Sequence, residues 1–293
     1  MTSGTTSAES TSLEAYSGVE HVFEPHSRLM PPLRQYLTEV WDRRAFAVAL
    51  AKADLRGGRS RTVMGELWSL LDPIFQAALY YLLIMMIRGG SGDEGSHRLI
   101  MLVSGIFLFG LTSKIIAKSA RSISTNKGLI INSTFPRLLL PLAEVHKAIL
   151  DFVPVMLVYI AFHVVMGGEV GVGFLMLPLL FVIQLALAFG IGMVFATLIV
   201  FVRDMSNLLD YIMRLFFFGS PILWEAASLP ESILSVLRFN PLFALFASYQ
   251  KVLALGGVPP VGLLLEAIFW AVLFMVMGLR LFVSNERGFA LRI

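Results

Sequence analysis

The chain has 293 residues, of which 57% are hydrophobic and 15% are charged, and its mean hydropathy is +0.78. About a quarter of the residues in a soluble domain are charged, so this composition excludes an ordinary soluble protein and predicts an all-α polytopic membrane protein. Cysteine is absent, which excludes disulfides and thiolate metal sites. The net charge of +3 is modest, and no nucleic-acid partner is needed to explain it.

The chain ahead of the first apolar run divides into two parts. Residues 1–32 predict a disordered cytoplasmic tail, because the first 27 residues are rich in Ser and Thr and lack the basic start and apolar run of a secretory signal. Residues 33–61 predict an amphipathic helix, in which Leu33, Leu37 and Trp41 recur at helical spacing among seven basic residues. Such a helix lies in the membrane interface, and the alternative is a solvated cytoplasmic helix.

Residues 62–293 predict a transmembrane domain with six spans of about 20 apolar residues each. The predicted spans are about 67–87, 98–117, 138–166, 174–201, 208–223 and 261–283. Of the 23 Lys and Arg residues, 18 lie on the side that holds both termini, four lie on the other side, and Arg214 lies inside the fifth span. Because positive charge is enriched on the cytoplasmic side, both termini are predicted to be cytoplasmic in a multi-pass protein of the inner (plasma) membrane.

The fifth span is short, and two short external helices are predicted after it. Its residues would form roughly 24 Å of helix against a hydrocarbon core of about 30 Å. Ser228 and Glu231 fit a capping box ahead of an apolar face, and Asn240 would cap a second helix with Pro241 at its first position. The two predicted apolar faces are Ile233, Leu234 and Leu237, then Leu242, Leu245, Phe246, Tyr249 and Leu253. These helices would be re-entrant and border a pore or cavity, or they form an ordinary external hairpin.

Residues 124–142 form a polar and basic stretch between the second and third spans. It is either a connecting loop or the point where a soluble partner binds. Asn126 and the hydroxyl residues before it favour a helix start, and Pro136 and Pro141 make a stiff join to the third span.

No catalytic constellation is found. The sequence contains no HExxH, GxSxG or G-x-x-x-x-G-K-[ST] motif, so use of ATP would need a site on another chain. His146 has no second ligand at a useful spacing, and no metal site is predicted. The chain is therefore predicted not to be an enzyme; a membrane-embedded lipid-linked transferase, the alternative, would need a polar catalytic cluster at one membrane face.

Charged and aromatic side chains within the spans are the candidate functional groups. Asp210 and Arg214 are four residues apart, so they either form an ion pair or leave Arg214 facing an anionic substrate group. Glu144, His146, Lys147 and Asp151 open the third span and are expected to be interfacial or mutually paired. Aromatic rings at membrane depth either pack against protein and lipid or together line a channel for a glycan. The candidates for such a channel are Tyr80, Tyr81, Phe107, Phe109, Phe216, Phe217 and Phe218.

Several short segments, in order and spacing across residues 33–293, are similar to one family. They are TVMGELWSLLDP at 62–73, FPRLLLPL at 135–142, the aromatic-x-Arg-Asp loop 201–204, Ser220-Pro221, Asn240-Pro241, and Glu286 with Phe289 near the end. Thr62 and Met64 depart from the Ser and Leu expected at those positions. The set resembles the permease subunits of ABC-2-type polysaccharide exporters of the Wzm and TarG type.

The resemblance implies a homodimer with one ATP-binding (Wzt-like) subunit under each copy, which would hold the ATP and Mg while this chain binds no cofactor. The amphipathic helix would lie on membrane lipid, and the transported substrate would be a lipid-linked polysaccharide. The coupling helix would comprise Asn126, Lys127, Gly128, Leu129, Ile130 and Ile131. The external gate would comprise Ser220, Pro221, Asn240 and Pro241, and the candidate diphosphate contacts are Arg61, Arg137, Arg203 and Arg214.

The glycan itself is a further prediction. The Ala-, Gly- and Arg-rich sequence and the Ser/Thr-rich tail suggest a high-GC actinobacterium, so a galactan precursor of the mycobacterial cell wall is the first choice, ahead of O-antigen and teichoic acid. An ABC-2 exporter of drugs or small lipids is the alternative within transport. A continuous aromatic-lined channel would favour the glycan, and a lateral hydrophobic cavity would favour the small molecule.

Overall fold

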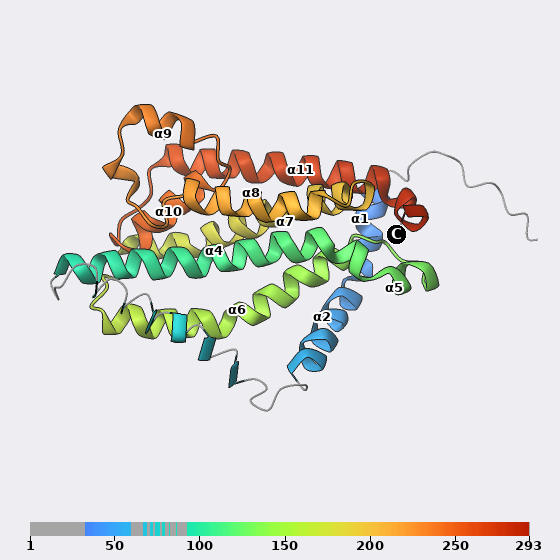
Figure 1. Cartoon of the computed structure of the whole chain (residues 1–293), viewed down its shortest axis with the longest axis horizontal. Coiled ribbons are helices and arrows are strands. Elements are labelled where there is room, and N and C mark those ends of the chain that lie inside the picture. The colour runs from blue at the N-terminus through green and yellow to red at the C-terminus, as the bar shows by residue number, and fades with distance from the viewer. Residues whose placement is uncertain are drawn as a thin grey trace, which may run out of the picture.

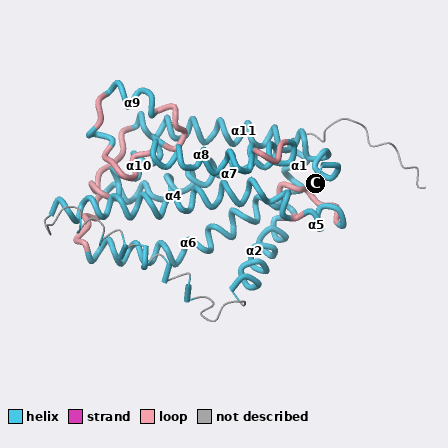
Figure 2. Tube along the Cα trace, viewed as in Figure 1, coloured by secondary structure: helices cyan, strands magenta, loops and turns pink. Residues whose placement is uncertain are grey.

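The computed structural model describes residues 33–59 and 93–292, together with 67–68, 71–72, 74–76, 78–79, 82 and 86. The predicted tail (1–32), most of the predicted first span, and Arg61, Tyr80 and Tyr81 lie outside the described residues. Within these ranges every regular element is a helix, joined by short loops (Figure 2).

Long helices lie side by side along the long axis of the molecule (Figure 1). They are α4 (Asp93–Thr125), α6 (Leu139–Val165), α7 (Leu177–Phe201), α8 (Met205–Gly219) and α11 (Val261–Arg292). Helix α7 is central because it packs against both α4 and α11. Glycines permit this close approach: a Cβ at Gly190 would lie 2.5 Å from the carbonyl carbon of Phe274, and one at Gly278 would lie 2.4 Å from the Gly190 carbonyl oxygen.

Four helices in the described part of the chain are long and apolar enough to cross a membrane. They are Ser96–Thr125, Leu139–Val165, Val172–Phe201 and Val261–Arg292, the third of which includes the short 3-10 helix η2 (Val172–Met176). These match the predicted second, third, fourth and sixth spans, while α8 at the predicted fifth span has only 15 residues. A multi-pass membrane protein is thus confirmed, and the number of six spans stays a prediction.

Two predicted spans end later in the structure than expected. Helix α4 continues to Thr125 and α11 to Arg292, beyond the predicted ends at residues 117 and 283. The prediction counted only apolar residues, whereas a helix continues through polar residues once it has left the hydrocarbon region.

The predicted amphipathic helix is two helices, α1 (Leu33–Asp42) and α2 (Arg44–Arg59), with a turn at Arg43. The break arises because the two parts pack against different surfaces. Helix α1 buries Tyr36 and Val40 at the end of the bundle, whereas α2 packs along α6 and leads away from the bundle axis (Figure 1).

The remaining short helices lie at opposite ends of the bundle (Figure 1). Helix α5 (Lys127–Asn132) lies near α1 and the C-terminus, and η3 (Ala226–Ser228), α9 (Glu231–Leu237) and α10 (Phe243–Leu253) lie at the other end. All five residues of the apolar face predicted for the second short helix are buried, which confirms that face.

The first short helix differs from its prediction. No residue of α9 is buried, and Ile233 is 46% exposed. The capping box is wrong: the Ser228 hydroxyl donates to the Glu225 carbonyl, and Pro230 occupies the N-cap position without a side-chain hydrogen bond. The 3-10 turn ahead of α9 uses the Ser228 hydroxyl locally, so it cannot cap the following helix.

Candidate functional site: an aromatic face between two anchored ends

The segment that joins α5 to α6 is bonded to the N-terminal helices. The Arg43 guanidinium at the turn between α1 and α2 donates to the Thr134 carbonyl over 3.2 Å, and the Leu138 amide donates to the Tyr36 hydroxyl over 3.3 Å. These bonds tie α1 and α2 to the six residues that follow α5. A movement of α5 would therefore also displace α1 and α2.

The last turns of α11 complete this end. The Arg137 amide donates to the Glu286 carboxylate over 2.7 Å, and the Arg137 guanidinium donates to the Glu286 carbonyl. Burial and the neighbouring Glu286 carboxylate raise the pKa of Tyr36, so its hydroxyl remains a protonated donor toward that carboxylate. Arg137, predicted as a diphosphate contact, is thus engaged by the protein itself.

One side of α5 is exposed at this end of the bundle. In α5, Lys127, Gly128 and Ile131 are exposed, with Ile131 at 65%, whereas Ile130 is buried. Beside α5, an open groove of about 970 Å³ runs between α1, the segment after α5 and the end of α11. Helix α5 therefore presents one side to the outside while its other side is anchored.

Four predicted substrate-contact residues come together on the face formed by α4 and α8. Phe109, Phe217, Phe218 and Arg214 line an open pocket of about 300 Å³, together with Ser113, Ala117, Asp210 and Met213. The ring centroids of Phe109 and Phe217 are 5.0 Å apart, and those of Phe217 and Phe218 are 5.3 Å apart. The Phe218 side chain is 64% exposed. The rings meet edge to face, and together with the Arg214 cation they form a surface that can contact a sugar chain or a phosphate.

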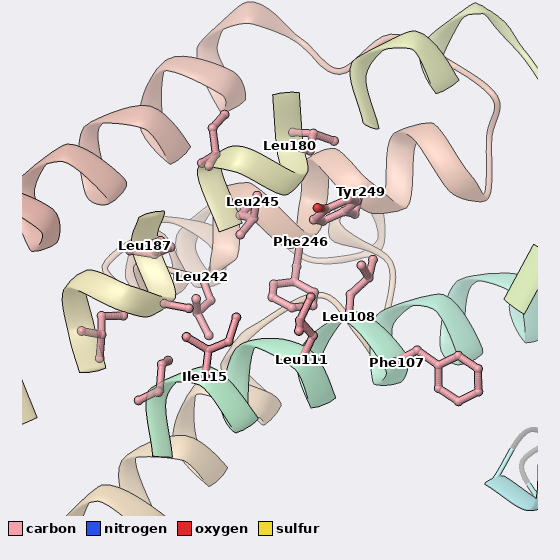
Figure 3. Close-up of a cluster of buried hydrophobic side chains, with 14 of the residues drawn as sticks. Phe107, Leu108, Leu111, Ile115, Leu180, Leu187, Leu242, Leu245, Phe246 and Tyr249 are labelled. Carbon is pink, nitrogen blue, oxygen red and sulfur yellow. The ribbon is translucent and has the colours of Figure 1, made fainter. Parts of the chain in front are cut away.

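Phe107 and Phe216, the other predicted aromatic residues among those the structure describes, lie elsewhere. Phe107 is buried and projects away from Leu111 and Phe246 (Figure 3), and it lines a separate apolar pocket of about 590 Å³ between α4, α6 and α7. Side chains two positions apart on a helix point in directions that differ by about 200° around its axis. Phe107 and Phe109 therefore lie on nearly opposite sides of α4. Phe216 is half-buried against the core.

Asp210 and Arg214 do not pair with each other as the first alternative predicted. The Asp210 carboxylate lies 2.8 Å from the Arg121 guanidinium of α4, which also donates to the Ser206 hydroxyl and carbonyl. The Arg214 guanidinium instead lies 5.7 Å from the centre of the Tyr211 ring. Arg121 therefore fixes α8 to α4 and leaves Arg214 at the pocket. Arg203 lies exposed in the turn between α7 and α8.

Two charged residues at the start of α6 form ion pairs with other helices. Lys147 lies 3.4 Å from Asp54 of α2, and Asp151 forms an ion pair with Lys114 of α4. His146 places Nδ1 2.9 Å from the carbonyl oxygen of Leu142, one turn earlier.

The predicted external-gate residues meet at the far end of the bundle. The Asn240 amide donates to the Ser220 hydroxyl over 3.0 Å and to the Phe216 carbonyl over 3.3 Å. Its side-chain carbonyl oxygen accepts from the Leu242 amide at 3.0 Å. The predicted cap is wrong: α10 begins at Phe243 with Leu242 at the N-cap position and no side-chain cap bond, so Pro241 precedes the helix. Asn240 thus joins the end of α8 to the start of α10, and Pro221 and Pro241 follow directly in the two turns.

A buried polar cluster was missed by sequence reasoning. The Gln184 amide of α7 donates to Thr112 Oγ1 over 2.8 Å and to the Leu108 carbonyl over 2.9 Å, and its oxygen accepts from the Tyr249 hydroxyl over 2.7 Å. A single Gln inside a long apolar segment was the available signal, because such a group needs partners in hydrocarbon. The cluster ties α10 to α4 and α7.

The chain was compared with known protein families and proteins. A family model described as ABC-2 type transporter matches residues 47–254. The chain belongs to this family. It is therefore a transport permease and not an enzyme, and in the described part of the chain no group of three or more His, Cys, Asp or Glu residues could hold a metal ion.

Relatives of similar length agree with this family. The chain is 26% identical over 244 residues to the O-antigen export system permease protein RfbA of Klebsiella pneumoniae, covering 83% of this chain and 93% of the relative. It is 24% identical over 264 residues to RfbA of Myxococcus xanthus, covering 86% and 96%. It is 25% identical over 247 residues to the polysialic acid transport protein KpsM of Escherichia coli, covering 83% and 93%.

The buried polar cluster gives a stability prediction. Tyr249→Phe removes the donor to Gln184 and leaves a buried amide oxygen unpaired, which should cost about 1 kcal/mol or more. The melting temperature of the purified chain in detergent should fall. Tyr211→Phe is the matched control, because Tyr211 is 66% exposed, and it should leave the melting temperature unchanged. Equal melting temperatures for the two variants would contradict the assigned hydrogen bond.

Proposed function

We propose that this chain is the permease subunit of an ABC transporter that exports a lipid-linked polysaccharide across the cytoplasmic membrane. The observation that carries the proposal is the similarity to O-antigen and polysialic acid export permeases over most of both chains. The phenylalanine rings and Arg214 on the α4–α8 face supply chemistry that such a substrate needs. In the working protein, two copies form a homodimer with six spans each.

The energy source is a separate ATP-binding subunit, which holds ATP and Mg. Helix α5 is the coupling helix to which this subunit binds. Support comes from the exposure of Lys127 and Ile131 and from the bonds that anchor the segment after α5. A short helix that is exposed on one side and bonded to the protein on the other can pass a movement of the bound subunit on to α1 and α2. This end of the bundle, with both termini, then lies in the cytoplasm.

The substrate path follows the α4–α8 face from this end toward α10. Arg214 binds a phosphate of the lipid-linked diphosphate, and Arg203 lies nearer the cytoplasmic opening. Phe109, Phe217 and Phe218 stack on sugar rings, which is a sequence-tolerant contact for a repeating polymer. The Asn240–Ser220 contact holds the external gate, because it joins the ends of α8 and α10.

The glycan stays a prediction. O-antigen and polysialic acid are the cargo in the names of the relatives, and the galactan precursor rests on composition alone. A small lipid is a second candidate cargo, favoured by the nearly apolar pocket of about 590 Å³ at the side of α6. Transport assays with a polymer and with a single-sugar lipid would separate the two.

The coupling role of α5 predicts a specific loss of function. Replacing Lys127 and Ile131 together by Asp should abolish substrate-stimulated ATP hydrolysis in the co-purified complex, because the exposed side of α5 would no longer fit the ATP-binding subunit. Val236→Asp is the control, since Val236 is 67% exposed on α9 at the far end. Stimulation that survives the double substitution would show that another segment does the coupling.

Arg214 predicts an effect on export and not on folding. Arg214→Ala should lower glycan export roughly tenfold or more, as for loss of a hydrogen bond to a charged group, with unchanged folded yield. Arg121→Ala is the contrasting variant, because it breaks the Asp210 ion pair and should lower folded yield. A loss of yield in Arg214→Ala equal to that in Arg121→Ala would assign Arg214 a structural role instead.

A further inference from the structure

A second groove lies between α1, α2 and the first turns of α6, on a different side from the α4–α8 pocket. It is open, has a volume of about 1010 Å³ and shares no lining residue with that pocket. Its lining is Leu37, Val40, Trp41, Asp42, Arg44, Ala45, Val48, Ala49, Lys52, Leu142 and His146. The proposed transport function uses none of these residues.

The groove exists because the facing side chains of α2 are small. Ala45, Val48 and Ala49 follow one another at helical spacing and form one wall, and Leu142 of α6 stands opposite. Residues the size of Leu at the two alanine positions would narrow the groove. The result is a groove with an apolar wall that is open at the surface.

Basic side chains flank the apolar wall on the same face of α2. Arg44 and Lys52 are eight residues apart, roughly 12 Å along a helix, and both line the groove. The Arg44 guanidinium donates to the Trp41 carbonyl over 2.8 Å and lies 4.5 Å from the centre of the Trp41 ring. This hydrogen bond uses one of the five N–H donors of Arg44. The other four remain available to a ligand, and the contact with Trp41 holds the guanidinium in place. Asp42 is the single carboxylate in the lining against these two cations.

The groove lies at the level of lipid head groups. Leu142 and His146 occupy the first two turns of α6, a helix apolar enough to span a membrane. Trp41 is 66% exposed, and Trp is typical of membrane–water boundaries. The Lys147–Asp54 ion pair, at 3.4 Å, holds α2 against α6 and so fixes the groove's width.

We propose that this groove binds an anionic glycerophospholipid of the bilayer. Arg44 holds the head-group phosphate, to which Arg offers a bidentate fork, and Lys52 adds a second positive charge farther along the groove. One acyl chain lies along Ala45, Val48 and Leu142. Charge complementarity selects an anionic head group over a zwitterionic one. A bilayer lipid fits better than the transported lipid-linked substrate, because the groove is separate from the aromatic pocket and has a single exposed ring, Trp41, and no stack for sugars.

The test uses the full-length chain purified in detergent and a phosphatidylglycerol that carries a photoreactive group on one acyl chain. Labelling should map to α2 and to the start of α6, and native mass spectrometry should show tighter retention of phosphatidylglycerol than of phosphatidylcholine with the same chains. Replacing both Arg44 and Lys52 by Gln should weaken this preference by roughly fivefold for each basic side chain. Arg56→Gln is the matched control on the same helix, since Arg56 is exposed but does not line the groove, and it should keep the preference.

A second variant separates loss of binding from loss of folding. Ala49→Trp fills the apolar wall and keeps both cations, so it should abolish acyl labelling of α2 while the melting temperature without added lipid is unchanged. The proposal is overturned if labelling maps away from α2 and α6, or if the Arg44/Lys52 variant keeps the full preference. Preferential displacement of the label by a polyprenyl diphosphate would overturn it in favour of the transported substrate. A cross-link from the groove to residues 60–92 in the absence of lipid would show that the chain itself fills the space.

Discussion

A polar group in hydrocarbon has no water to bond, and the arrangement of the bundle depends on this constraint. Gln184 lies within the apolar helix α7, and its amide is satisfied by Thr112 and the Leu108 carbonyl of α4 and by Tyr249 of α10. This cluster fixes the position of α10 relative to the two long helices. The residues at the start of α10, and the Asn240–Ser220 contact with α8, depend on that position. The far end is therefore held by polar bonds as well as by apolar packing.

Helix α4 connects the parts to which we assign function. It contributes Phe109 to the α4–α8 pocket, Thr112 to the buried polar cluster and Arg121 to the ion pair with Asp210 of α8. Its C-terminal end leads directly into α5, which begins at Lys127. A displacement of α5 would reach the substrate face through one continuous helix. The anchors on the segment after α5 would carry the same displacement to α1, α2 and the end of α11.

The sequence predicted the parts that depend on local pattern. The buried face of α10 followed from helical spacing alone. Long-range partners were out of reach: Arg121 and Asp210 are 89 residues apart, so sequence spacing offered only the nearer Arg214 as a partner for Asp210. The separation of Phe107 from Phe109 was foreseeable, because a two-residue step turns a helix side chain to the opposite side.

The central claim is that the α4–α8 face carries the glycan, and photo-cross-linking in cells that make the polymer tests it directly. A photoreactive phenylalanine analogue would replace Phe109 or Phe218, and, as the comparison site, Leu157, which is 59% exposed on α6 and lines the separate apolar pocket. Radiolabelled glycan should attach to the chain at the first two positions and not at Leu157. Attachment at Leu157 with none at Phe109 or Phe218 would contradict the account and place the substrate on the other side of the bundle.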